Sequence, residues 1–160
     1  MPFSSLRAAH GYSFVELMIV TTILLILASA ILPLTRMTVQ RQREIELRRS
    51  LRELRGAIDA YKDAVDNGLI GGTDVRVGSE GYPPDLETLV EGVTVQNDQS
   101  GRRLKFLRRI PIDPMTGEAD WGLRSYQDRP DSTSWGGQNV YDVHTRSDGT
   151  ALDGTRYRDW

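Results

Sequence analysis

The hydrophobic pattern of the chain starts with a long and nearly unbroken apolar run. From Phe14 to Leu34 almost every residue is apolar, whereas the rest of the chain mixes apolar and polar positions. This length is close to the ~20 residues that a helix needs to cross a bilayer. It exceeds the apolar core of a secretory signal peptide, although Ala28 and Ala30 satisfy the small-residue rule of a cleavage site. A membrane helix is the direct prediction, and a signal peptide is the alternative.

Beyond the apolar run, the periodicity predicts that the helix continues. Apolar residues recur at alternating spacings of four and three, at Leu47, Leu51, Leu54, Ile58, Tyr61 and Val65. The opposite positions, expected to be solvated, carry Arg41, Arg43, Glu44, Glu46, Arg48, Arg49, Arg52, Glu53 and Arg55. The stripe also fits a coiled coil, but a helix packed on a sheet is the preferred interpretation. The helix is expected to end near Asp66 to Gly68.

A loop and a second, short helix are predicted next. Five glycines between residues 68 and 82 indicate a loop. Pro83-Pro84-Asp85 then begins a helix, because proline suits the first turn, and Gly92 is expected to close it.

The last third of the chain predicts strands and turns. Pro114 to Gly117 is a turn, and strand candidates follow at residues 119–126 and 140–145. A long N-terminal helix followed by short strands predicts an α+β fold, with the helix packed on a small antiparallel β-sheet.

Charge and composition narrow the function classes. The 160 residues include 20 basic and 22 acidic ones, interspersed, so no nucleic-acid partner is expected. The absence of cysteine excludes disulfides, Cys-ligated zinc and a thiol nucleophile. His144 has no serine or cysteine motif near it and is expected on a strand surface instead of in a catalytic site. We therefore expect no enzymatic activity.

One acidic residue interrupts the apolar run. An acidic side chain at the centre of a membrane helix costs about 2.5–3.5 kcal/mol, and less near its edge. Glu16 lies three places inside the run, so either it is solvated near the headgroups or a positive group compensates it.

The residues before Glu16 favour the second interpretation. Gly11-Tyr-Ser-Phe-Val-Glu16 follows a short polar leader, Met1 to His10, that holds Arg7 and no acidic residue. This arrangement resembles the processing motif of type IV prepilins. The resemblance implies cleavage after Gly11, methylation of the new N-terminus at Tyr12, and Glu16 as the hallmark glutamate. Tyr12 stands where the family usually has phenylalanine.

The resemblance agrees with the electrostatics. Cleavage after Gly11 would create a cationic amine on Tyr12, able to neutralise Glu16 of a neighbouring subunit in an apolar bundle. Methylation would keep that charge. Pro33 stands where the family has its mid-helix proline, and it either kinks the helix or ends it.

The expected organisation follows from this motif. Residues 1–11 would be a leader that is removed, and residues 12–35 the transmembrane and assembly half of the N-terminal helix. Residues 36–160 would form the globular head, including the amphipathic half of the helix. The fold that the resemblance implies is the pilin fold.

A narrower resemblance covers the head. Gly81 to Pro84, Phe106 to Pro114 and Tyr141 to Gly149 are similar to segments of the major pseudopilin, protein G, of type II secretion. Met115 to Gly117 and Asp128 to Trp135 depart from that pattern. The resemblance implies a subunit of a pseudopilus, anchored once in the bacterial inner membrane with a periplasmic head, that polymerises to drive protein export.

That resemblance also implies partners. They are further copies of the chain, minor pseudopilins, an inner-membrane assembly platform, a cytosolic ATPase and a prepilin peptidase. The alternatives are a type IV pilus subunit for adhesion, motility or DNA uptake, and an anchored periplasmic enzyme or receptor.

Calcium is the one metal that the sequence suggests. Protein G binds calcium in a terminal loop, and here Asp148 and Asp153 supply carboxylate oxygens with glycines that permit a tight turn. The same residues are typical of plain surface turns, and the pattern is not an EF-hand. No other cofactor is expected.

Overall fold

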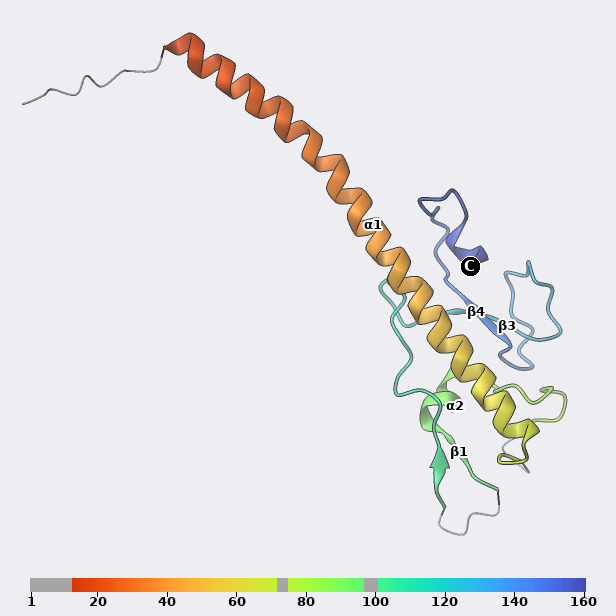
Figure 1. Cartoon of the computed structure of the whole chain (residues 1–160). Helices are drawn as coiled ribbons and strands as arrows, with labels where there is room; N and C mark the ends of the chain where they lie inside the picture. Colours follow the sequence, from red (N-terminus) through yellow and green to blue (C-terminus); the bar gives the residue numbers. More distant parts are fainter. Residues whose placement is uncertain (1–12, 72–74, 97–100) are drawn as a thin grey trace, which may run out of the picture. The chain divides into compact units, whose positions relative to one another are not determined.

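The computed structural model describes residues 13–71, 75–96 and 101–160, without the side chains of residues 30–36. The long helix α1 (Phe14–Asp66) leads into a head that contains the short helix α2 (Leu86–Glu91), short strands and a final 3-10 turn at Tyr157–Asp159 (Figure 1). The contacts within the chain divide it into two compact units, Met1–Val39 and Gln40–Trp160. The second unit, here called the head, is described below by itself.

Helix α1 confirms that the helix continues past the apolar run. Position 33 lies within it, so the interpretation in which Pro33 ends the helix is wrong; the side chain of Pro33 lies outside the described residues. The helix ends at Asp66, as predicted. There Gly68 adopts a φ of 69°, and Leu69 N donates to Ala64 O at 2.9 Å, satisfying a carbonyl of the last turn.

The apolar stripe of α1 forms the centre of the head's core. Leu47, Leu54 and Ile58 are completely buried, and Leu51 and Tyr61 nearly so. Each such side chain contributes about 1.5–3 kcal/mol to stability when it is fully buried. They pack with apolar side chains from α2, from the strands and the residues just before them, and from the C-terminal segment, namely Leu86, Leu89, Val93, Trp121, Val140, Val143 and Tyr157.

Two antiparallel strand pairs complete the α+β fold. Strand β1 (Val93–Thr94) pairs with β2 (Arg103–Leu104), and β3 (Gly122–Arg124) pairs with β4 (Asp142–His144). The strands predicted at residues 119–126 and 140–145 are confirmed in place but are shorter. The β1–β2 pair was not predicted, because strands this short show no alternation.

Helix α2 begins and ends at two of its predicted signals, Asp85 and Gly92, whereas Pro83 and Pro84 precede the helix instead of lying in its first turn. Asp85 accepts a hydrogen bond from Thr88 N at 2.8 Å, which caps the helix N-terminus. Gly92 closes it with a φ of 80°, and a Cβ at this position would lie 2.6 Å from Leu104 O of strand β2. Glycine is therefore required here both for conformation and for space.

A buried aspartate organises the predicted turn at Pro114 to Gly117. Gly117 N donates to Asp113 O at 2.8 Å, and Met115 N donates to Asp113 Oδ1 at 2.8 Å. The Thr145 hydroxyl, just beyond β4, donates to Asp113 Oδ2. Asp113 is completely buried, so it joins the turn to β4 through the interior of the head.

His144 is not the strand surface residue that we expected. It lies in β4, but it is buried, and among the described residues its Nδ1 is a buried polar atom without a hydrogen-bond partner. Its ring covers Gly122, its partner across the β3–β4 pair, where a Cβ would lie 2.3 Å from His144 Nε2. The missing side chain at Gly122 creates the space that lets the imidazole turn inward.

Two charged residues of α1 were also placed wrongly on the solvated face. Arg55 Nε donates to Asp142 Oδ1 at 2.7 Å, and its Nη2 donates to the carbonyls of Val143 and Trp160. Glu44 Oε1 accepts hydrogen bonds from the Tyr157 hydroxyl and from Leu152 N. These two residues fasten the C-terminal segment to α1.

Candidate assembly site on the N-terminal helix

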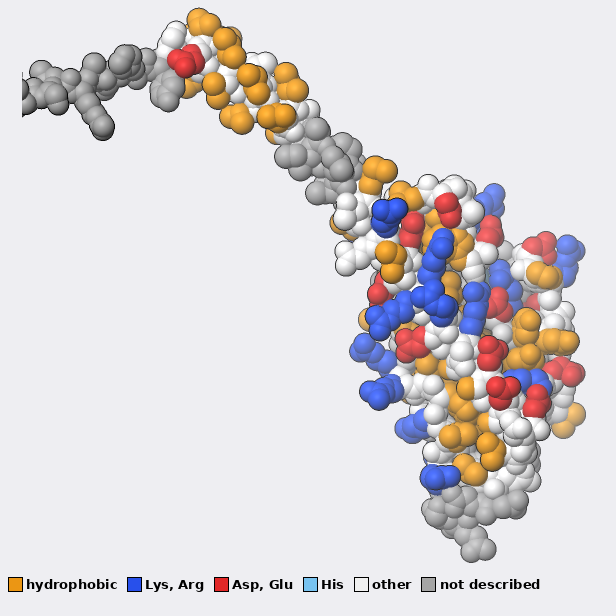
Figure 2. All heavy atoms as spheres, in the orientation of Figure 1, with side chains coloured by type: hydrophobic (Ala, Val, Ile, Leu, Met, Phe, Trp, Pro, Cys, Tyr) orange, Lys and Arg blue, Asp and Glu red, His pale blue; other side chains and the backbone are white. Residues whose placement is uncertain are grey.

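The first turns of α1 present apolar side chains to their surroundings. The large apolar residues from Phe14 to Leu27 range from 49% exposed at Val20 to 76% at Phe14 (Figure 2). Such continuous exposure is typical of a segment that another apolar surface covers. Within the described residues, no helical stretch reaches the length and hydropathy that a membrane span requires.

The hydroxyl groups of this segment are satisfied by its own backbone. Thr21 donates to Leu17 O at 2.8 Å, Thr22 to Met18 O at 2.7 Å and Ser29 to Ile26 O at 2.7 Å. Bonds of this kind remove the need for water around the helix. The hydroxyls therefore do not oppose an apolar environment.

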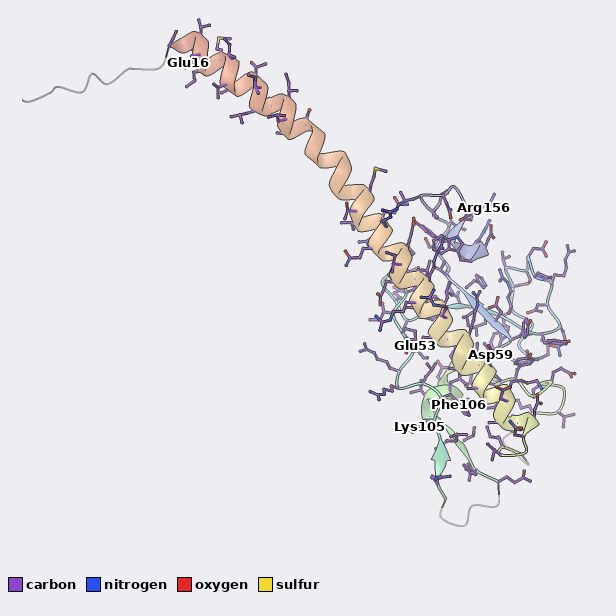
Figure 3. The ribbon with its side chains drawn as sticks, in the orientation of Figure 1. Glu16, Glu53, Asp59, Lys105, Phe106 and Arg156 are labelled. Carbon is purple, nitrogen blue, oxygen red and sulfur yellow. The ribbon has the colours of Figure 1, made fainter. Side chains whose placement is uncertain are left out.

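Glu16 differs from these hydroxyl residues. It lies in the first turn of α1, where the helix dipole favours a negative charge (Figure 3). Its side chain is exposed, and among the described residues it forms neither a hydrogen bond nor an ion pair. An apolar environment would leave this carboxylate uncompensated unless a positive group came from outside the described part of the chain.

The other predicted residues of the motif lie outside this geometry. Gly11 and Tyr12 fall outside the described residues, as does the side chain of Pro33. Leader cleavage, methylation and the mechanical role of the proline therefore stay predictions.

The two candidate calcium ligands are engaged with other residues. Asp148 pairs with Arg158 at 3.1 Å and Asp153 with Arg48 at 3.5 Å. Hydrogen bonds from Thr155 lower the pKa of Asp153. No group of three or more potential metal-ligating side chains occurs within the described ranges. Calcium binding stays a prediction. If calcium binds here, it should raise the melting temperature of the wild-type head but not that of an Asp148→Asn/Asp153→Asn variant.

One surface feature was overlooked at the level of sequence. One line of exposed positions on α1 in the head carries basic charges before Gly56 and acidic charges after it, while the exposed Glu46 and Glu53 lie beside this line. The 3.6-residue periodicity contains this signal, which emerges only when the charges are followed along a single line of the helix surface.

Comparison with known protein families matches residues 6–32 to the prokaryotic N-terminal methylation motif. No curated protein and no solved structure gives a significant match. The matched residues include Gly11, Tyr12 and Glu16, and they run into the exposed apolar turns of α1. The chain thus carries the N-terminal signal of type IV pilin-like prepilins, ahead of an α+β head in which a long helix packs with small antiparallel strand pairs, as in the pilin fold.

Proposed function

We propose that this chain is a structural subunit of a type II secretion pseudopilus, anchored in the inner membrane with its head in the periplasm. Subunits would be extracted from the membrane and added to a growing filament, and the filament's growth would drive protein export. The observation that carries the proposal is Glu16, a carboxylate that pairs with none of the described residues and lies in an apolar helix whose described hydroxyl residues bond internally.

The assembly chemistry follows from neutralising this charge. A prepilin peptidase would cut after Gly11, and the new amine on Tyr12, methylated but still cationic, would pair with Glu16 of an adjoining subunit. Leaving one partner of a buried ion pair unpaired is strongly unfavourable. Only the register that brings amine and carboxylate together is then stable, so Glu16 would select how a subunit is added.

Secretion is preferred over a pilus because of the head. The stretch Gly81 to Pro84, which precedes α2, and the stretch Phe106 to Pro114 resemble protein G. The chain also contains no cysteine, whereas many adhesive pilins staple a terminal loop with a disulfide. The alternative, a type IV pilus subunit, shares the whole N-terminal argument.

The deciding experiment is incorporation of Glu16 variants into filaments. Full-length chain would be produced together with a type II secretion assembly machinery, and sheared filaments would be collected by sedimentation. We expect Glu16→Ala and Glu16→Gln subunits to be nearly absent from the filaments, because both leave the neighbouring amine unpaired. Glu16→Asp should retain part of the incorporation.

Glu53→Ala provides the matched control. Glu53 is an exposed carboxylate on the same helix, within the head, and it forms no ion pair with any described residue (Figure 3). Its substitution should leave incorporation unchanged. Equal incorporation of Glu16→Ala and wild-type subunits would refute the proposed role of the carboxylate. If filaments form with a pilus machinery but not with a secretion machinery, the pilus alternative would replace the proposal.

A further inference from the structure

One line of exposed positions on α1 in the head is sorted by charge along its length, and the exposed Glu46 and Glu53 lie outside this line. On the side opposite the apolar stripe, successive turns carry a series that we call the outer stripe: Arg41, Ile45, Arg48, Arg49, Arg52, Gly56, Asp59, Asp63 and Asp66. All nine residues are exposed. The half before Gly56 contains only basic charges and the half after it only acidic ones.

Most charges of the outer stripe have no ion-pair partner in the part of the chain that the structure describes. Arg41, Arg49, Arg52, Asp59 and Asp63 form no ion pair with any described residue. Two members do have partners, because Arg48 contacts Asp153 and Asp66 contacts Lys62. The stripe is therefore available to another molecule over most of its length.

The arrangement is unfavourable for an isolated helix. Arg48 and Arg52 are four residues apart, as are Asp59 and Asp63, and like charges at this spacing repel each other on a helix. The acidic half also approaches the negative end of the helix dipole, where the last turn contains no basic residue.

Gly56, which lies where the charge of the outer stripe changes sign, further lowers the stability of the helix. Glycine weakens the interior of a helix, and nothing lies within 4 Å of a Cβ built at Gly56, so the fold of the head does not require it. Features that oppose the local structure without benefit inside the chain are expected where a surface serves a function.

We propose that the outer stripe is a contact surface for a second copy of this chain, and that the basic half of one copy meets the acidic half of the next. The inference rests on the proposed function, because filament subunits enter by the same end and therefore run parallel. Arg41, Ile45 and Arg48 repeat as Asp59, Asp63 and Asp66 at an interval of 18 residues. That interval is about five helical turns. A parallel copy displaced by about 27 Å therefore brings Arg41 opposite Asp59 and Arg48 opposite Asp66, with the uncharged Ile45 opposite Asp63.

This contact is heterologous, because different patches of the two copies meet, and it can repeat without closing. Each subunit offers its acidic half to one neighbour and its basic half to another. Gly56 lies between the two contacts, where the missing side chain allows a neighbouring helix to approach closely. Since these charges are exposed, the contact should weaken as salt concentration rises.

Disulfide trapping tests the register, because the chain has no cysteine of its own. Filaments of full-length Ile45→Cys/Asp63→Cys subunits would be oxidised and separated under non-reducing conditions. The displaced parallel contact predicts a ladder of cross-linked multimers. Each single variant should give no ladder, because its thiol would face the native residue of the neighbour.

Charge exchange supplies an independent readout. Arg41→Asp and Asp59→Arg should each raise the critical concentration for filament assembly by about fivefold, and the double variant should restore it. Arg43→Asp, an equal charge change at an exposed position off the outer stripe, is the control and should have little effect. None of these variants should lower the melting temperature of the head, and Asp59→Arg should raise it slightly, because it removes a like-charge contact with Asp63.

The outcomes separate this inference from the proposed function. Glu16-dependent filaments without a ladder, or without rescue by the double variant, would overturn the stripe contact and leave the filament proposal standing. A dimer trapped by Gly56→Cys alone would indicate an antiparallel pair crossing at Gly56, and it would also overturn the contact. A chain that never enters filaments would remove both.

Discussion

At the scale of single residues, two buried polar side chains differ in how well their hydrogen-bonding groups are satisfied: Asp113, at the turn before β3, and His144, in β4. Asp113 receives hydrogen bonds from the Thr145 hydroxyl and from Met115 N, whereas His144 leaves Nδ1 without a partner among the described residues. Buried polar groups stabilise a fold when they are bonded and weaken it when they are not. These two residues should therefore respond differently to substitution and to pH.

We predict that Asp113→Ala lowers the free energy of unfolding of the head by about 3 kcal/mol, because it removes the acceptor of the buried Thr145 hydroxyl and of the partly buried Met115 N. Chemical denaturation would measure the change. Asp131→Ala, which removes an exposed partner of Arg129, is the control and should change the stability by less than about 0.5 kcal/mol. A similar small effect at Asp113 would show that its buried hydrogen bonds do not stabilise the head.

We predict that the head loses stability as the pH falls below about 6.5, the ordinary pKa of histidine. Burial lowers the pKa of His144, and Arg124 beside it acts in the same direction, against the smaller opposing effect of Asp142. Above pH 6.5 the imidazole is neutral in both states, so it does not affect folding. Below that pH the unfolded chain takes up the proton first, and this stabilises the unfolded state until the folded pKa is reached.

Melting temperatures between pH 8 and pH 5 test the role of His144. The loss should be smaller in His144→Gln, which keeps a polar side chain but does not titrate in this range. Identical pH profiles for the two proteins would assign the acid sensitivity to other groups.

Residue-level roles were only partly predictable. The sequence places His144 in a strand, but its burial depends on Gly122 across the β3–β4 pair, and single-strand patterns do not reveal such pairing. Glu16 was identified because its anomaly is local, an acid inside an apolar run. A residue whose role depends on a distant partner leaves no such local signal.

At the scale of elements, the junction between α1 and the C-terminal segment depends on Arg55. We predict that Arg55→Met lowers the free energy of unfolding by about 2–3 kcal/mol, because it removes charge-assisted bonds to Asp142 and to two carbonyls. Arg52→Met, one turn earlier and exposed, should change it by less than about 0.5 kcal/mol. If urea denaturation shows that Arg55→Met changes the free energy of unfolding as little as Arg52→Met does, the contacts of Arg55 with the C-terminal segment contribute little to stability.

Gly56→Ala tests the helix that carries the outer stripe. It should raise the free energy of unfolding of the head by about 0.5–1 kcal/mol, because alanine is the better helix former and no atom obstructs its Cβ. Thermal or urea denaturation of the head would show it. A destabilised Gly56→Ala head would mean that glycine is needed inside the fold after all, which would weaken the argument for an external partner.

Elements with a long periodic signal were predicted best. The apolar stripe from Leu47 to Tyr61 determined the buried face of α1, and Asp85 and Gly92 marked the ends of α2. The β1–β2 pair was missed because each strand has two residues, too few for a period of two to be seen. Arg55 was assigned to the wrong environment because helical periodicity does not tell which charges the C-terminal segment will reach.

At the scale of the whole molecule, the methylation motif at residues 6–32 predicts that the chain is cleaved and methylated near its N-terminus. We predict that the mature chain, in cells that contain a prepilin peptidase, begins at a methylated Tyr12. Mass spectrometry of the N-terminal peptide would show the loss of residues 1–11 and the added methyl group. An intact Met1 under those conditions would count heavily against the assignment, and cells without the peptidase provide the control.

The attachment of the C-terminal segment to α1 has a consequence for how this protein can be handled. Gln40, Glu44 and Arg55 hold that segment through hydrogen bonds and ion pairs, and the sequence contains no thiol that could lock it covalently. Reducing agents should therefore leave the fold intact, and the head should refold from urea without an oxidant. Soluble head could accordingly be produced in a reducing cytosol, which makes the measurements described above accessible without export.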